Sequence, residues 1–203
     1  MSKFYRIARA TVAFLSHIFF RVKVYGTQNI PWEGAVILAC NHRSMWDPVF
    51  LARGIKKRQM FFMAKQELMD APVIGAVLRW LGAYGVTRGR RDTSAIDTAT
   101  QILSEGKMLA VFPEGTRAKE GEPLKPQSGV AAIVGRTRAN VLPASIYFDG
   151  KIRFFMRVTV RFGRAIESEE FDFSEVMTSS ERKQAAVTIM ERITGMLVRE
   201  HEA

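Results

Sequence analysis

The sequence predicts an α/β fold with a mixed, largely parallel sheet flanked by helices. Short apolar runs alternate with helical patterns along a chain of 203 residues, which is a length that suits one domain. The composition, 47% hydrophobic and 25% charged, is typical of a folded protein. The apolar runs are the expected strands, at Val22–Tyr25, Ala35–Cys40, Met60–Ala64, Ala83–Thr87, Met108–Phe112, Val141–Tyr147 and Phe154–Phe162.

Helical patterns fill the intervals between these strands. Apolar residues recur at helical spacing in Asp92–Glu105, which Gly106 is placed to end, and more weakly in Ser128–Thr137. Thr178 and Glu181 have the spacing of a capping box, so a last helix is expected to begin after Thr178.

The N-terminal segment predicts an amphipathic helix. Its expected apolar stripe is Phe4, Ala8, Val12, Leu15 and Phe19, with Ile7, Phe14 and Ile18 beside it and Arg6, Arg9, Ala13 and Ser16 on the far side. No stretch has the roughly 20 apolar residues of a membrane-spanning helix, and no small-residue cleavage site follows. Two interpretations remain, an in-plane membrane anchor and a first helix packed on the core. We expect residues 1–21 to be an anchoring helix and 22–203 the main domain.

The charge balance points to polyanionic partners. Thirty Lys and Arg residues against twenty Asp and Glu give a net charge of +10, which suits an anionic membrane, phosphorylated substrates or nucleic acid. The basic residues are dispersed and form no recognition helix, which argues against nucleic acid. One cysteine excludes an internal disulfide and a multi-cysteine metal site, and predicts a reducing, cytoplasmic setting.

A histidine and an aspartate follow the expected strand Ala35–Cys40. On a continuous helix the five-residue offset between His42 and Asp47 rotates the side chains by about 140°, so they meet only across a strand-to-helix turn. Pro48 predicts that turn, with Asp47 as the N-cap of the next helix. An imidazole oriented by a carboxylate is a general base that can deprotonate a hydroxyl. The alternative is a helix cap beside an ordinary loop histidine.

The hydroxyl to be deprotonated is expected to belong to the substrate. No G-x-S-x-G elbow supplies a serine nucleophile, and Ser44 lies inside the turn itself. Cys40 is a second candidate nucleophile, but a buried strand cysteine is the simpler interpretation. The sequence therefore offers no nucleophile for a serine hydrolase.

A second polar segment, Phe112–Arg117, follows the strand that begins at Met108. Gly115 allows close backbone approach, Thr116 can donate a hydrogen bond and Arg117 suits bidentate phosphate recognition. Glu114 adds a carboxylate. The alternative is a tight turn with a surface Glu–Arg pair.

Two further cations come directly after strands. Lys65 follows Met60–Ala64 and Arg88 follows Ala83–Thr87, and we interpret both as phosphate ligands. Arg90 and Arg91 fit a solvated face. Because the carboxyl ends of parallel strands share one edge of a sheet, these cations are expected to converge on the His–Asp pair.

Four motifs in fixed order carry a family resemblance. They are N-H-x4-D at Asn41–Asp47, a glycine-to-arginine motif at Gly82–Arg88, F-P-E-G-T-R at Phe112–Arg117 and a strand with an internal proline, Pro143. From about Val22 to Tyr147 the chain resembles the glycerolipid and lysophospholipid acyltransferases, and most of all their bacterial 1-acyl-glycerol-3-phosphate acyltransferase branch.

The resemblance implies a reaction and a setting. His42 would deprotonate the acceptor hydroxyl while Asp47 holds it, and the oxygen would attack the thioester of acyl-CoA or acyl carrier protein. Acceptor contacts would come from Arg88 and from Glu114 to Arg117, with Asn41 and Pro143 in support and no metal or organic cofactor. The acceptor would be a lysophospholipid, with glycerol 3-phosphate or another lysolipid as the alternative. The enzyme would sit on the cytoplasmic face of the membrane, without spanning it. A lipid-binding or regulatory protein with a dead site is another alternative, and it loses force because His42, Asp47, Glu114 and Arg117 are all present.

Overall fold

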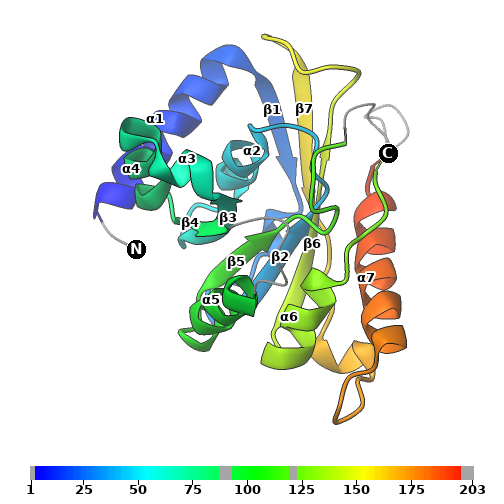
Figure 1. The fold of residues 1–203 in the computed structure, drawn as a ribbon. Helices are drawn as coiled ribbons and strands as arrows, with labels where there is room; N and C mark the ends of the chain where they lie inside the picture. The colour runs from blue at the N-terminus through cyan, green and yellow to red at the C-terminus, as the bar shows by residue number, and fades with distance from the viewer. Residues whose placement is uncertain (1–2, 87–92, 119–122, 198–203) are drawn as a thin grey trace.

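The computed structural model describes residues 3–86, 93–118 and 123–197, and it forms three layers of helices, sheet and helices (Figure 1). Within the described residues the sheet has seven strands in the order β1-β7-β6-β2-β5-β3-β4. The strands are β1 (Arg21–Tyr25), β2 (Val36–Cys40), β3 (Met60–Lys65), β4 (Ala83–Val86), β5 (Met108–Val111), β6 (Asn140–Tyr147) and β7 (Arg157–Phe162).

The sheet is mixed and mostly parallel, as predicted. Neighbouring strands run parallel throughout except for the antiparallel pair of β6 and β7. At the centre, Leu38 of β2 lies opposite Ala110 of β5 and Leu142 of β6. Every residue of β2 and β5 is buried, because helices cover both faces of the sheet there.

Two groups of helices form the outer layers. On one face lie α1 (Lys3–Phe19), α2 (Asp47–Gly54), α3 (Gln66–Asp70) and α4 (Pro72–Trp80), and on the other α5 (Thr93–Ser104), α6 (Gly129–Thr137) and α7 (Ser179–Thr194). Short 3-10 turns occur at η1 (Thr27–Asn29) and η2 (Ser168–Phe171). The predicted capping box is present, since Thr178 accepts from the Glu181 N–H and Glu181 accepts from the Thr178 N–H.

Two parts of the fold differ from the sequence prediction. The helices α3 and α4 were not predicted, and Gly75 of α4 packs so closely on α3 that an added Cβ would lie 2.0 Å from the Met69 carbonyl oxygen. The last strand starts at Arg157 and not at Phe154. The reason is local, since Phe155 has a φ of 62° and donates its N–H to the Phe19 carbonyl, which turns the chain before β7.

The inner face of α1 also differs from the predicted one. Tyr5 and Ser16 are buried, whereas Ser16 had been placed on the far side. Burial of Ser16 is possible because its hydroxyl donates to the Ala13 carbonyl. The outward face instead carries Phe4, Ile7, Phe14 and Ile18. In the described part of the chain, no helix has both the length and the apolar character needed to cross a bilayer.

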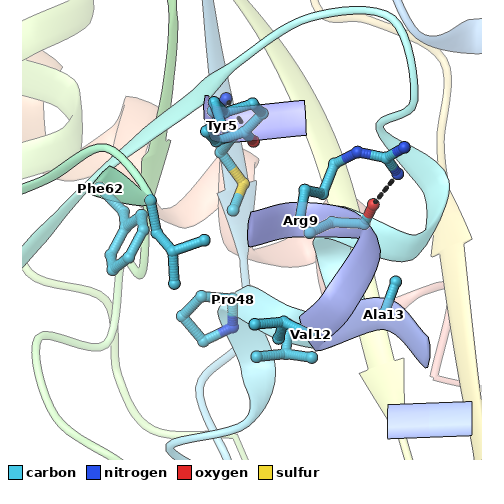
Figure 2. Close-up of a pocket in the computed structure, with 10 residues that line it drawn as sticks. Tyr5, Arg9, Val12, Ala13, Pro48 and Phe62 are labelled. Carbon is cyan, nitrogen blue, oxygen red and sulfur yellow. Dashed lines mark hydrogen bonds between the residues drawn. The ribbon is translucent and has the colours of Figure 1, made fainter. Parts of the chain in front are cut away.

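An apolar cavity of about 30 Å³ lies between α1, α2 and β3 (Figure 2). Tyr5, Val12 and Ala13 line it from α1, Pro48 from α2 and Phe62 from β3. Hydrogen bonds also join α1 to the domain, because the Tyr5 hydroxyl accepts the Met60 N–H at 3.3 Å and the Ala13 carbonyl accepts from the Arg53 guanidinium at 2.8 Å.

Candidate active site

The loop after β2 is fastened to the neighbouring strand by Asn41. Its side-chain oxygen accepts the Ile146 N–H at 2.8 Å, and its amide donates to the Ile146 carbonyl at 2.9 Å. Asn41 is 1% exposed, so these bonds form away from water. They fix the point at which the chain leaves the sheet, one residue before His42.

The Asp47 carboxylate organises the turn itself. Its Oδ2 accepts the Arg43 N–H at 2.7 Å and the Ser44 N–H at 2.9 Å, and lies 2.7 Å from Nδ1 of His42. Because the carboxylate folds back onto the preceding residues, it does not cap the helix as predicted. Asp47 is the first residue of α2, and Trp46 occupies the cap position without a side-chain bond.

The His42 ring is oriented by two neighbours, the Asp47 carboxylate and the Phe112 ring. A carboxylate only accepts, so in the neutral imidazole the proton lies on Nδ1, which faces Asp47, and the lone pair lies on Nε2. The His42 side chain is 16% exposed and that of Asp47 is fully buried. The Phe112 ring stacks on the imidazole with centroids 4.1 Å apart and planes 18° apart. An imidazole oriented by a carboxylate in this way can act as a general base.

The backbone of His42 is held by the loop that follows β5. Glu114 accepts the His42 N–H through Oε1 at 2.7 Å, and Ala118 donates its N–H to the His42 carbonyl at 2.8 Å. The other Glu114 oxygen accepts the Leu124 N–H at 2.8 Å. Glu114 is 2% exposed, and burial raises the pKa of its carboxyl although both N–H donors act against the shift. Both carboxylate oxygens of Glu114 therefore accept hydrogen bonds from backbone N–H groups.

The next residues of this loop face solvent. Gly115, Thr116 and Arg117 are exposed, and Gly115 has a positive φ of 68° that favours glycine. Lys65 is exposed at the end of β3. Since β2, β5 and β3 are adjacent and parallel, His42, Lys65 and the Phe112–Arg117 loop lie at one edge of the sheet, as predicted. Arg88, Arg90 and Arg91 lie outside the described residues.

Pro143 is not at this edge. It is buried in the middle of β6, opposite Ala39 of β2, and its carbonyl accepts the Gly163 N–H at 2.8 Å. A Cβ built on Gly163 would lie 3.1 Å from the Pro143 ring and 2.9 Å from the Met196 sulfur, which places the ring on the α7 side of the sheet. Pro143 thus contributes packing on the layer opposite α2.

Two supporting residues were not singled out from the sequence. The sequence marked Phe112 only as the first residue of its motif. Its stacking on His42 could not be predicted from local spacing, because the two residues are 70 positions apart. Arg43 donates to the carbonyls of Phe148 at 2.5 Å and Gly150 at 3.2 Å, and its guanidinium lies 4.1 Å from the Phe148 ring centroid. Burial lowers the pKa of Arg43. It ties the loop that carries His42 and Asp47 to the end of β6.

The burial of Cys40 argues against a thiol nucleophile beside the pair. Cys40 is fully buried, and burial raises the pKa of its thiol well above the ordinary value. Among the residues that the structure describes, no group of three or more His, Cys, Asp or Glu side chains is placed to hold a metal ion.

Comparison with known proteins shows the family. The acyltransferase family model matches residues 21–147, which contain the His–Asp pair, the Phe112–Arg117 loop and six of the seven strands. This chain belongs to the acyltransferase family.

Individual relatives extend the comparison. A 1-acyl-sn-glycerol-3-phosphate acyltransferase of Bacillus subtilis is 36% identical over 124 residues, or 61% of each chain. One of Streptococcus pneumoniae is 29% identical over 148 residues, which cover 70% of this chain and 54% of that protein. The chain thus aligns with little more than half the length of these relatives. The crystal structure of the acyltransferase PlsC from Thermotoga maritima has the same fold, with a TM-score of 0.70 over 95% of this chain and 76% of that one, at 24% identity.

Proposed function

We propose that this acyltransferase moves an acyl chain from a thioester to the sn-2 hydroxyl of 1-acyl-glycerol-3-phosphate and forms phosphatidic acid. The observation that carries the proposal is the His42–Asp47 pair, at 2.7 Å, with the His42 side chain partly exposed at the carboxyl edge of the sheet. The names of the curated relatives support the acceptor. The donor is acyl-CoA or acyl carrier protein, and no cofactor takes part.

The mechanism follows from the residues at this edge. Nε2 of His42 takes the proton of the acceptor hydroxyl as its oxygen attacks the thioester carbonyl, and Asp47 stabilises the imidazolium that forms. Collapse of the tetrahedral intermediate expels the thiolate, to which the imidazolium returns the proton. Both functions use one nitrogen, so the acceptor oxygen and the thioester sulfur must lie on the same side of the ring.

The exposed cations at this edge bind the acceptor phosphate in our proposal. Arg117 and Lys65 are exposed, and neither has an ion pair with the described part of the protein. Arg88 belongs to the same proposal through its motif, and Gly115 and Thr116 shape the loop that carries Arg117. Glu114 takes a positioning role, because both of its oxygens hold backbone N–H groups.

The proposal includes a place at the membrane. The acceptor and product are lipids, so the enzyme would act on the cytoplasmic face of an anionic membrane, with α1 as its anchor. The net charge of +10 supports this setting.

The test is acyl transfer in detergent from labelled acyl-CoA and from acyl carrier protein. Lysophosphatidate, glycerol 3-phosphate and a phosphate-free lysolipid are offered in parallel. We expect transfer to lysophosphatidate, lost in His42→Ala with an unchanged circular dichroism spectrum. Arg117→Ala should raise the acceptor KM, whereas Arg192→Ala, an exposed arginine on α7, should not. Transfer only to the phosphate-free acceptor would overturn the cation assignment, and a fully active His42→Ala would overturn the mechanism.

A further inference from the structure

An apolar stripe runs along the outward face of α1. Phe4, Ile7, Phe14 and Ile18 are each about half or more exposed, and at 100° per residue they lie within an arc of about 80°. The opposite face of the helix carries buried Tyr5 and the residues that line the cavity in Figure 2. Since that inner face is already packed on the domain, the outward stripe needs a separate explanation.

A second apolar stripe lies on the short helix α4. Val73, Ile74, Val77 and Trp80 are all exposed, from 39% for Val77 to 76% for Val73. Gly75 alone in this helix is buried, against α3. A helix of nine residues thus turns most of its large apolar side chains away from the protein.

The two stripes meet at one aromatic contact. The rings of Phe4 and Trp80 have centroids 4.4 Å apart and cross at 61°. Figure 1 shows α1 and α4 side by side, and the two helices are in contact. We call the eight residues of both stripes the α1–α4 surface. At the other end of α1, the Phe154 ring packs against Phe19 at a tilt of 46° and is itself exposed, as is Phe155.

The two helices that carry the α1–α4 surface have charges of one sign. The sequences of α1 and α4 contain no acidic residue, whereas Lys3 and Arg6 are exposed on α1 and Arg79 on α4. Arg79 also anchors α4, because its guanidinium donates to the Met69 carbonyl at 2.8 Å. An apolar surface whose own two helices carry only cations complements the headgroup region of an anionic bilayer, and the exposed Glu67 and Asp70 belong to the adjoining helix α3.

We propose that α4 is a second membrane-docking element and that the α1–α4 surface enters the headgroup region of a bilayer containing anionic phospholipid. Trp80, at the junction, lies at the depth that tryptophan prefers in membranes. The inference rests on the proposed function, which requires lipid substrates to reach the site. It differs from anchoring by the N-terminal helix alone, because docking through both helices fixes the orientation of the sheet edge relative to the bilayer.

The experiment is flotation of the full chain with phosphatidylglycerol-containing vesicles and with pure phosphatidylcholine vesicles. Val73→Asp changes α4 and Ile7→Asp changes α1, at positions exposed enough to leave the fold intact. Val176→Asp is the matched control, because Val176 is 82% exposed in the loop before α7. We expect each of the first two variants to weaken partitioning into the anionic vesicles about tenfold or more, and the control to bind as the wild type does.

Trp80 also provides a direct probe. It is 51% exposed, and vesicle binding should shift tryptophan emission to the blue and make it sensitive to brominated lipid. Trp80→Phe, which keeps an aromatic contact for Phe4, should lose most of this shift and quenching. A variant that keeps the full response would show that Trp80 stays in water and would overturn the proposal.

The remaining outcomes separate the alternatives. If Val73→Asp floats like the wild type while Ile7→Asp does not, α1 docks alone and the proposal is wrong. If the chain is a dimer without lipid and Val73→Asp makes it a monomer, a second copy of the chain covers the α1–α4 surface, and this result also overturns the proposal. Turnover of a soluble short-chain lysophosphatidate should be unchanged in Val73→Asp. Absence of such turnover in the wild type would refute the proposed function and leave the vesicle result standing.

Discussion

Substitution of Glu114 distinguishes two roles for the loop after β5, which are binding the acceptor and holding the backbone of His42. The resemblance assigns it to acceptor binding, whereas the structure places both carboxylate oxygens on backbone donors, the N–H groups of His42 and Leu124. In Glu114→Gln the amide can accept only one of these bonds. The other N–H then faces an NH₂ group, so one buried donor loses its partner and meets a second donor.

The expected size of the effect follows from that geometry. A hydrogen bond to a charged group contributes about 1.5–3 kcal/mol, and a buried donor without a partner costs a similar amount. We therefore expect Glu114→Gln to lower the free energy of unfolding by about 2–4 kcal/mol. For a chain of this size each kcal/mol changes the melting temperature by about 2–4 °C, which gives a decrease of roughly 5–15 °C.

The assay combines thermal unfolding with steady-state kinetics. Because Glu114 holds the His42 backbone, kcat should fall with little change in the acceptor KM. Glu191→Gln, at an exposed position on α7, is the control and should change neither quantity. An unchanged melting temperature together with a raised acceptor KM would refute this reasoning and return Glu114 to acceptor binding.

Four further changes have expected outcomes. Asp47→Asn keeps an acceptor for His42 but removes the charge, so kcat should fall about 10- to 100-fold, and a wild-type rate would contradict the mechanism. Phe112→Leu removes the ring stacked on His42 and should lower kcat about 2- to 10-fold with a small change in melting temperature, whereas unchanged kcat would exclude a positioning role. Cys40→Ala should remain active, and native Cys40 should resist a thiol reagent until the protein unfolds, because burial raises its pKa; rapid labelling would contradict its burial. Hydrogen bonds at the helix N-terminus lower the pKa of Glu181 to about 2, so its stabilising contribution is complete above pH 4.5 and is lost as the pH falls through 2. Urea unfolding of Glu181→Gln should thus differ from wild type at pH 6 and converge with it near pH 2, and a constant difference would disprove the linkage.

The strands could be predicted from the sequence because each carries its own signal. All seven expected apolar runs form strands, since a buried parallel strand is a short apolar run whatever its neighbours are. The start of the last strand was misplaced because the contact that turns the chain, from the Phe155 N–H to the Phe19 carbonyl, joins residues far apart in sequence. The α4 pattern was missed for a related reason. The apolar face of α4 is not packed on the core, so the spacing of its apolar residues does not indicate what that face contacts.

The His–Asp pair and the residues that support it differ in the same way. His42 and Asp47 are five residues apart, and the backbone donors to Asp47, from Arg43 and Ser44, come from the same turn, so local stereochemistry brings them together. Asp47 was nevertheless predicted to cap α2, because sequence spacing does not tell whether a carboxylate turns forward to the helix or back to the loop.

The residues that hold this turn in place come from distant strands. Glu114 reaches His42 across 72 positions and Asn41 reaches Ile146 across 105. Because β5 and β6 both flank β2, these two contacts fix the loop from either side, so the orientation of His42 depends on the register of the three central strands. A one-residue slip of β5 would invert its side chains and remove the Glu114 bond along with part of the core. The two groups proposed to carry the chemistry thus come from one short segment, whereas the exact position of His42 depends on the packing of the whole sheet.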